Sequence, residues 1–127
     1  MPEPISLISS ADIKPEEFTN FLRQVGAVLH PDNLYDGCLS KGNLHVWIAL
    51  DNSELKNFDA DEIELITQQL GGCPQTHILL DISKKLGSEQ IALEFACKLA
   101  TRWNCVIYDY EQKIHSRQEL LDLCPIA

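Results

Sequence analysis

The feature that most constrains the fold of this 127-residue chain is the segment 77–108, in which two short apolar runs flank a long amphipathic stretch. Residues 77–82 are almost continuously apolar, as in a strand that is buried on both faces. Residues 88–103 carry apolar side chains at helical spacing in one broad stripe, and residues 105–108 have the composition of a second strand. The segment therefore predicts a β-α-β crossover with two parallel strands.

The N-terminal part of the chain predicts a strand and then a helix. Residues 5–8 are apolar and short enough to be a first strand. A helical stripe then runs from Phe18 to Leu29, with Asp12 as its cap and Pro15 in the first turn, where a missing N–H costs little. We expect this helix to end near His30.

The middle of the chain predicts two strands, one within the turn-rich segment 31–43 and one directly after it. A short strand is expected around Cys38, and residues 44–50 alternate between apolar and other side chains. Glycines 71 and 72 follow an apolar stripe and predict the end of a helix. Three helix starts carry capping residues, namely Asp59 with Glu62, Ser88, and Ser116 with Glu119.

Together these patterns predict an α+β fold, an α/β sandwich with the approximate order β-α-β-β-α-β-α-β-β-α. Helices should pack on at least one face of a mixed sheet. An apolar share of 45% with 23% charged residues is typical of a globular chain. No linker-like stretch interrupts the sequence, so we expect one globular domain over residues 1–127.

The charge balance restricts the kind of partner. Nineteen Asp and Glu against ten Lys and Arg give a net charge of −9, which repels phosphate backbones and argues against direct binding of nucleic acid. The same field favours encounter with a basic protein. No apolar run approaches the ~20 residues that span a bilayer, and the N-terminus lacks a secretion signal. We therefore expect a cytoplasmic protein without a membrane partner.

An acidic stretch over residues 51–64 is the first candidate for partner binding. Its acids are Asp51, Glu54, Asp59, Asp61, Glu62 and Glu64. A cationic partner could dock on them. A helix macrodipole alone would also stabilise acids in the first turn, which accounts for Asp59, Asp61 and Glu62 without any partner. Asp51, Glu54 and Glu64 have no such local explanation.

Trp47 is the second candidate for partner binding. It lies on the strand face opposite Leu44, Val46 and Ile48. Core packing is the favoured interpretation, because large aromatic side chains are mostly buried. An exposed Trp47 would instead be an interface anchor, a role in which tryptophan is enriched.

Catalytic and metal sites have little support in the sequence, and we expect no cofactor and no metal. His45, His77 and His115 could meet on neighbouring strands, but nothing in their spacing predicts a ligand set. The five cysteines form no metal-binding motif, so five reduced thiols are expected. The enzyme alternative would use residues at strand ends, namely His77, Asp81 and Asp109.

The second half of the chain resembles a known class of proteins. The segments GSEQIALEFACKLATRW and CVIYDYEQKIHSRQEL, within residues 75–123, are similar to small immunity proteins of bacterial contact-dependent growth-inhibition and polymorphic toxin systems. The shared pattern is an Ala-rich helix, a strand ending in Tyr-Asp, a hairpin and a capped helix. The resemblance implies a cytoplasmic antidote that binds a cognate toxin domain, commonly a nuclease, and needs no catalysis of its own.

Two further functions stay open beside the immunity protein. One is a small regulatory or adaptor domain that binds another protein. The other is an enzyme with a site at the strand ends. The expected function is non-catalytic protein binding, and a concave pocket with convergent titratable groups would favour the enzyme.

Overall fold

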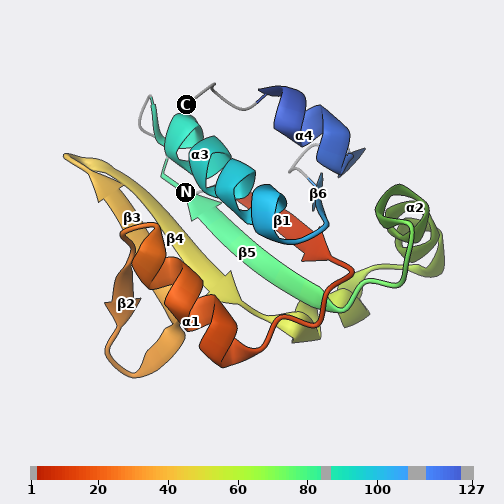
Figure 1. Ribbon diagram of the computed structural model, residues 1–127, viewed down its shortest axis with the longest axis horizontal. Helices are drawn as coiled ribbons and strands as arrows, with labels where there is room; N and C mark the ends of the chain where they lie inside the picture. The colour runs from red at the N-terminus through yellow and green to blue at the C-terminus, as the bar shows by residue number, and fades with distance from the viewer. Residues whose placement is uncertain (1–2, 84–86, 109–113, 124–127) are drawn as a thin grey trace.

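The computed structural model describes residues 3–83, 87–108 and 114–123, which form one twisted sheet with helices (Figure 1). The sheet has the strand order β2-β3-β4-β5-β1-β6-β7. Its strands are β1 (Glu3–Ser9), β2 (Val28–His30), β3 (Asn33–Lys41), β4 (Leu44–Leu50), β5 (Thr76–Ile82), β6 (Cys105–Tyr108) and β7 (Ile114–His115). The helices are α1 (Pro15–Gln24), the 3-10 helix η1 (Asn52–Asn57), α2 (Ala60–Leu70), α3 (Ser88–Arg102) and α4 (Arg117–Leu123).

The α+β class is confirmed, and the β-α-β crossover is present in a split form. Strand β1 lies between β5 and β6 and pairs antiparallel with both. The two strands that flank α3 therefore run in the same direction, as expected, but are not neighbours. Every strand pairing in the described residues is antiparallel. Local periodicity carries no information about a strand inserted from the other end of the chain.

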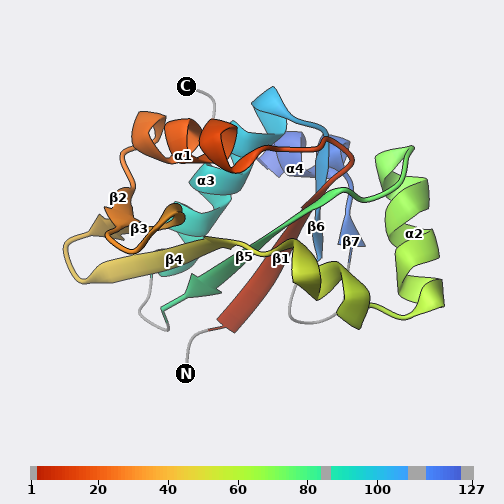
Figure 2. The same ribbon diagram turned by 90° about the horizontal axis from the view of Figure 1, so that it is seen from below.

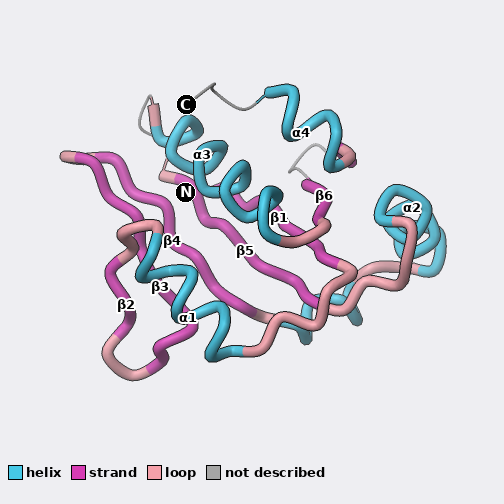
Figure 3. Tube along the Cα trace, viewed as in Figure 1, coloured by secondary structure: helices cyan, strands magenta, loops and turns pink. Residues whose placement is uncertain are grey.

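The main core lies between the sheet and one layer of helices, α1, α3 and α4. Figures 1 and 3 show α1 and α3 crossing in front of the strands. The alternation of β4 and β5 points Val46, Ile48 and Leu80 toward this layer, where Phe18 and Phe95 are also fully buried. This face of the sheet is covered along most of its width.

A second, smaller core lies on the opposite face of the sheet. There α2 packs Ile66 and Leu70 against Ile8 of β1 and Val106 of β6. The helix begins at the predicted capping box of Asp59 and Glu62 and ends at Gly71, whose φ of 73° is the left-handed conformation that favours glycine. The predicted start and the predicted end of α2 are therefore both confirmed.

The helix expected from Phe18 to Leu29 is wrong at its C-terminal end. Helix α1 ends at Gln24, because Gly26 takes a φ of 86° and closes the last turn. The Gly26 N–H donates to Arg23 at 3.2 Å and the Ala27 N–H donates to Leu22 at 2.9 Å, a Schellman motif. Leu29 reaches the core from the edge strand β2 instead.

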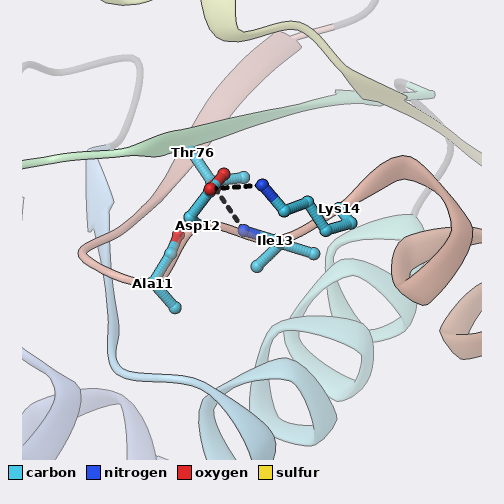
Figure 4. Close-up of polar contacts among 5 residues, drawn as sticks. All are labelled: Ala11, Asp12, Ile13, Lys14 and Thr76. Carbon is cyan, nitrogen blue, oxygen red and sulfur yellow. Dashed lines mark hydrogen bonds and ion pairs between the residues drawn. The ribbon is translucent and has the colours of Figure 1, made fainter.

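The predicted cap of α1 is also wrong, because the residue at this position is Lys14, without a side-chain bond to the helix. Asp12 accepts from Lys14 Nζ at 2.6 Å, and this hydrogen bond raises the pKa of Lys14 (Figure 4). The approach to α1 is held by buried Thr76, whose hydroxyl donates to the Ala11 carbonyl at 2.7 Å and accepts from the Ile13 N–H at 3.0 Å.

The other two predicted caps differ in outcome. The Ser116–Glu119 capping box before α4 is confirmed, with the Glu119 N–H donating to Ser116 Oγ at 3.2 Å. The cap of α3 is Gly87 rather than Ser88. Ser88 is the first helical residue, fully buried, and its hydroxyl is hydrogen-bonded to Ser83.

Candidate interaction surface

Part of the second sheet face has no described helix over it. Helix α2 and η1 stand over the β1–β6 side and the His77 end of β5, and Figure 2 shows α1, α3 and α4 together on the other side of the sheet. The face formed by β2, β3, β4 and the Asp81 end of β5 is left uncovered by the described elements. Strand register places Val28, Cys38, Trp47 and Asp81 side by side across it. We call this row and its flanking residues the open face.

Trp47 is exposed, which overturns the expectation that it packs in the core. Its side chain belongs to the face opposite Val46 and Ile48, and no described helix covers that face at β4. The residue keeps 45% of its surface accessible, and Val28 keeps 72%. The ring of His45, on the same strand face, lies 5.7 Å from the Trp47 ring. Large exposed apolar side chains that share one face favour an interaction site.

A groove runs along the open face beside Trp47, with a volume of about 390 Å³. Its floor and walls are mostly apolar, and its charged lining residues are Asp36 and Asp81. The residues that line it are Val28, Leu29, His30, Pro31, Asp36, Gly37, Cys38, Trp47, Ile48, Ala49 and Asp81. The helical stripe that continues to Leu29 predicts a helix where β2 lies, so the sequence does not identify Val28 as a surface residue. Gly26, with its φ of 86°, is the signal that marks the end of the helix.

Some acids of the predicted acidic site make hydrogen bonds within the chain. Asp51 caps η1, where its Oδ1 accepts from the Ser53 N–H at 3.1 Å. Asp59 and Glu62 accept from each other's N–H groups at the start of α2, and the Tyr108 hydroxyl donates to Glu62. These three carboxylates therefore have local structural roles. Glu54 lies within η1.

The remaining acids face solvent on α2. Asp61 and Glu64 are exposed, and so is Leu65, at 53%. Because α2 packs on Ile8 and Val106, it stands on the same side of the sheet as Trp47. The structure thus brings Trp47 and the acids of α2 to one side of the sheet, as an apolar floor with an acidic flank.

The histidines do not converge. His45 lies at the start of β4 and His77 at the start of the antiparallel strand β5, so they are at opposite ends of the strand pair. His115 lies on β7, 3.7 Å from Glu119. In the described part of the chain, no group of three His, Cys, Asp or Glu side chains is placed to hold a metal ion.

His77 is a structural residue, only 1% exposed. Its Nδ1 donates to the Asp51 carbonyl at 3.0 Å, and its Nε2 is hydrogen-bonded to Ser6 Oγ at 2.8 Å. Asp81 lies four residues along β5, on the order of 13 Å away, so these two members of the enzyme alternative do not share a pocket. Asp109, its third member, lies outside the described residues.

The cysteines correct the expectation of five reduced thiols. Cys97 is disulfide-bonded, whereas Cys38, Cys73 and Cys105 are free, and Cys124 lies outside the described residues. Disulfides are rare in cytosolic proteins, whose thiols are kept reduced. Burial raises the pKa of the Cys105 thiol to about 12, which keeps it protonated and a poor nucleophile at neutral pH.

No known protein family, curated protein or solved structure matches this chain. Of the helices in the described ranges, none combines the length and the apolar character that a membrane span requires.

Proposed function

We propose that this protein is a non-catalytic binding domain that docks a basic protein on the open face and its acidic flank. The observation that carries the proposal is exposed Trp47, in one cross-strand row with exposed Val28, on a part of the sheet face that no described helix covers. Aromatic anchors surrounded by a polar rim are where interfaces concentrate their binding energy.

The acidic flank supports a cationic partner in particular. Asp61 and Glu64 are exposed on α2, on the same side of the sheet as Trp47, in a chain of net charge −9. Rim carboxylates act mainly on the rate of association, which they raise at low salt. Asp51 and Glu62 already bond within the chain, so we propose for them a smaller share of partner binding.

More specifically, we propose an immunity protein that binds and neutralises a toxin domain. A nuclease is the first toxin class to test. The similarity of residues 75–123 to such proteins supports it, and so does the acidity, because nuclease active sites present Lys and Arg to phosphates. The same proposal places the protein in the cytoplasm, where reducing conditions would leave Cys97 as a thiol.

A co-expression assay tests the proposal. The gene adjacent to this one should encode a large protein with a toxic C-terminal domain, and co-expressing this chain should restore growth of cells that produce that domain. Trp47→Ala should weaken binding by about tenfold or more, as expected for an interface anchor. Failure of rescue with the intact chain would contradict the immunity role, and binding to a non-toxic protein instead would indicate the adaptor role.

The acidic flank is tested with matched charge variants. We expect Asp51→Asn, Glu54→Gln, Asp61→Asn and Glu64→Gln together to slow association about tenfold at low salt. Glu16→Gln, Glu17→Gln, Glu89→Gln and Asp122→Asn change the net charge equally at exposed positions on α1, α3 and α4. Equal effects of both sets would mean that net charge alone, and not this flank, steers the partner.

A further inference from the structure

We infer that the groove beside Trp47 binds an arginine side chain of the partner, with the guanidinium stacked on the indole and paired with Asp81. This inference rests on the proposed function and names the chemistry that the partner must present. It uses Asp81 and groove residues that lie outside the acidic stretch.

Strand register places the Trp47 ring and the Asp81 carboxylate next to each other. Trp47 of β4 and Asp81 of β5 are directly paired across the antiparallel ladder, and both line the groove. Directly opposite residues have Cβ atoms about 4.5–5.5 Å apart, so the indole and the carboxylate rise side by side. A planar cation lying on the ring can reach the carboxylate at its edge.

The Asp81 carboxylate is available to a ligand. Among the described residues it makes no hydrogen bond and no ion pair, although the residue is partly buried. A partly desolvated carboxylate gains from a charge-assisted hydrogen bond more than an exposed one does. Asp36 adds a second negative charge, and none of the residues lining the groove is Lys or Arg.

The neighbouring histidine is bonded within the chain. His30 also lines the groove, and its Nδ1 accepts from the Asp32 N–H at 3.1 Å. The acidic side chains that line the groove are those of Asp36 and Asp81.

Arginine fits the groove better than lysine. Its guanidinium is planar, stacks on aromatic faces and binds a carboxylate through two parallel N–H groups. The described residues contain a guanidinium placed over aromatic rings, since Arg102 Cζ lies 4.5 Å from the centroid of the Trp103 ring and 5.9 Å from that of the Phe21 ring. A volume of about 390 Å³ also falls within the range of about 300–1,000 Å³ typical of ligand sites.

The test uses two tripeptides and the intact protein. Acetyl-Gly-Arg-Gly-amide is titrated against its citrulline counterpart, which keeps the shape and loses the charge, while the two indole N–H signals are followed by NMR. Trp47→Phe identifies the Trp47 signal, and the Trp103 signal serves as an internal control for folding. We expect the arginine peptide to shift the Trp47 signal and the citrulline peptide to bind about tenfold more weakly.

Two protein variants locate the charge partner. Asp81→Asn keeps the shape of the side chain and should weaken arginine binding by about tenfold. Glu89→Gln makes the same change in charge at an exposed position on α3, and should leave binding unchanged. Equal affinities for the two peptides, or no effect of Asp81→Asn, would overturn the inference.

The outcomes also separate this inference from the proposed function. A toxin domain that binds through Trp47 but is insensitive to Asp81→Asn leaves the binding function intact and rejects the arginine site. An arginine peptide that binds through Asp81, in a protein that fails the rescue assay, supports the site and rejects the immunity role.

Discussion

Trp47 and His77 show how neighbouring strands give similar rings opposite roles. Both residues lie on the face of the sheet away from α1 and α3. His77 is covered by η1 and satisfies both ring nitrogens with hydrogen bonds to Asp51 and Ser6. Trp47 has none of the described elements above it and keeps nearly half of its surface exposed. Whether a ring has a structural role is therefore decided by burial under another segment and not by residue type.

His77→Ala should therefore destabilise the protein strongly. The change leaves a cavity and removes the hydrogen-bond partners of the Asp51 carbonyl and the Ser6 hydroxyl, at a cost of about 2–4 kcal/mol. Urea denaturation measures the loss in the free energy of unfolding. His30→Ala is the control, because His30 is exposed, and should cost less than about 0.5 kcal/mol. Equal losses in the two variants would contradict a structural role for His77.

At the scale of elements, α2 depends on its ends and on a small contact area. Two residues, Ile66 and Leu70, are buried in it, whereas α3 buries eight. The capping box of Asp59 and Glu62 therefore contributes a large share of what holds α2. Two carboxylates of the acidic stretch serve this purpose, and the acidity of a helix start is weak evidence for a partner.

Asp59→Ala should lower the free energy of unfolding by about 1 kcal/mol, because the Glu62 N–H loses its acceptor. Thermal unfolding followed by circular dichroism measures the change. Asp61→Ala removes the same charge two residues further along, in the first turn, with no capping bond, and should cost about 0.3 kcal/mol from the macrodipole. A larger loss for Asp61→Ala would contradict the assignment of the cap.

At the scale of the whole molecule, stability is divided unequally between the two faces of the sheet. The main core joins α1, α3 and α4 to the sheet, and the second core has four buried residues, two on α2 and two on the strands beneath it. Elements with few buried contacts open locally at lower free energy than the global unfolding reaction. We therefore expect α2, with its acids, to open locally at lower free energy than α3.

Amide hydrogen exchange should reveal this division. We expect the amides of α2 to exchange faster than those of α3. Because Ile66 is fully buried in the second core, Ile66→Ala should raise the exchange rates in α2 further and leave those in α3 nearly unchanged. Leu65→Ala removes the same number of atoms from an exposed position of α2 and should have little effect. Uniform acceleration across the molecule would show that the two cores unfold together.

The sequence predicted the elements that depend on nearby residues. Alternation in residues 44–50 and the apolar run 77–82 identified β4 and β5, and the helical stripe after Ser88 identified α3. Side-chain caps identified the starts of α2 and α4, because a capping bond joins residues three positions apart. The same logic failed at α1, where Gly26 ends the helix against an apolar stripe that continues to Leu29.

Tertiary structure alone decided the order of the strands and which sheet face stays open. Strand β1 enters between β5 and β6 from the far end of the chain, a pairing that no local pattern contains. Alternation showed that β4 has two faces, but the cover on each face comes from helices elsewhere in the sequence. The acidic stretch could be found in the sequence because charge is a property of residues. The exposure of Trp47 and its place beside Asp81 could not, because they arise only when distant strands pair.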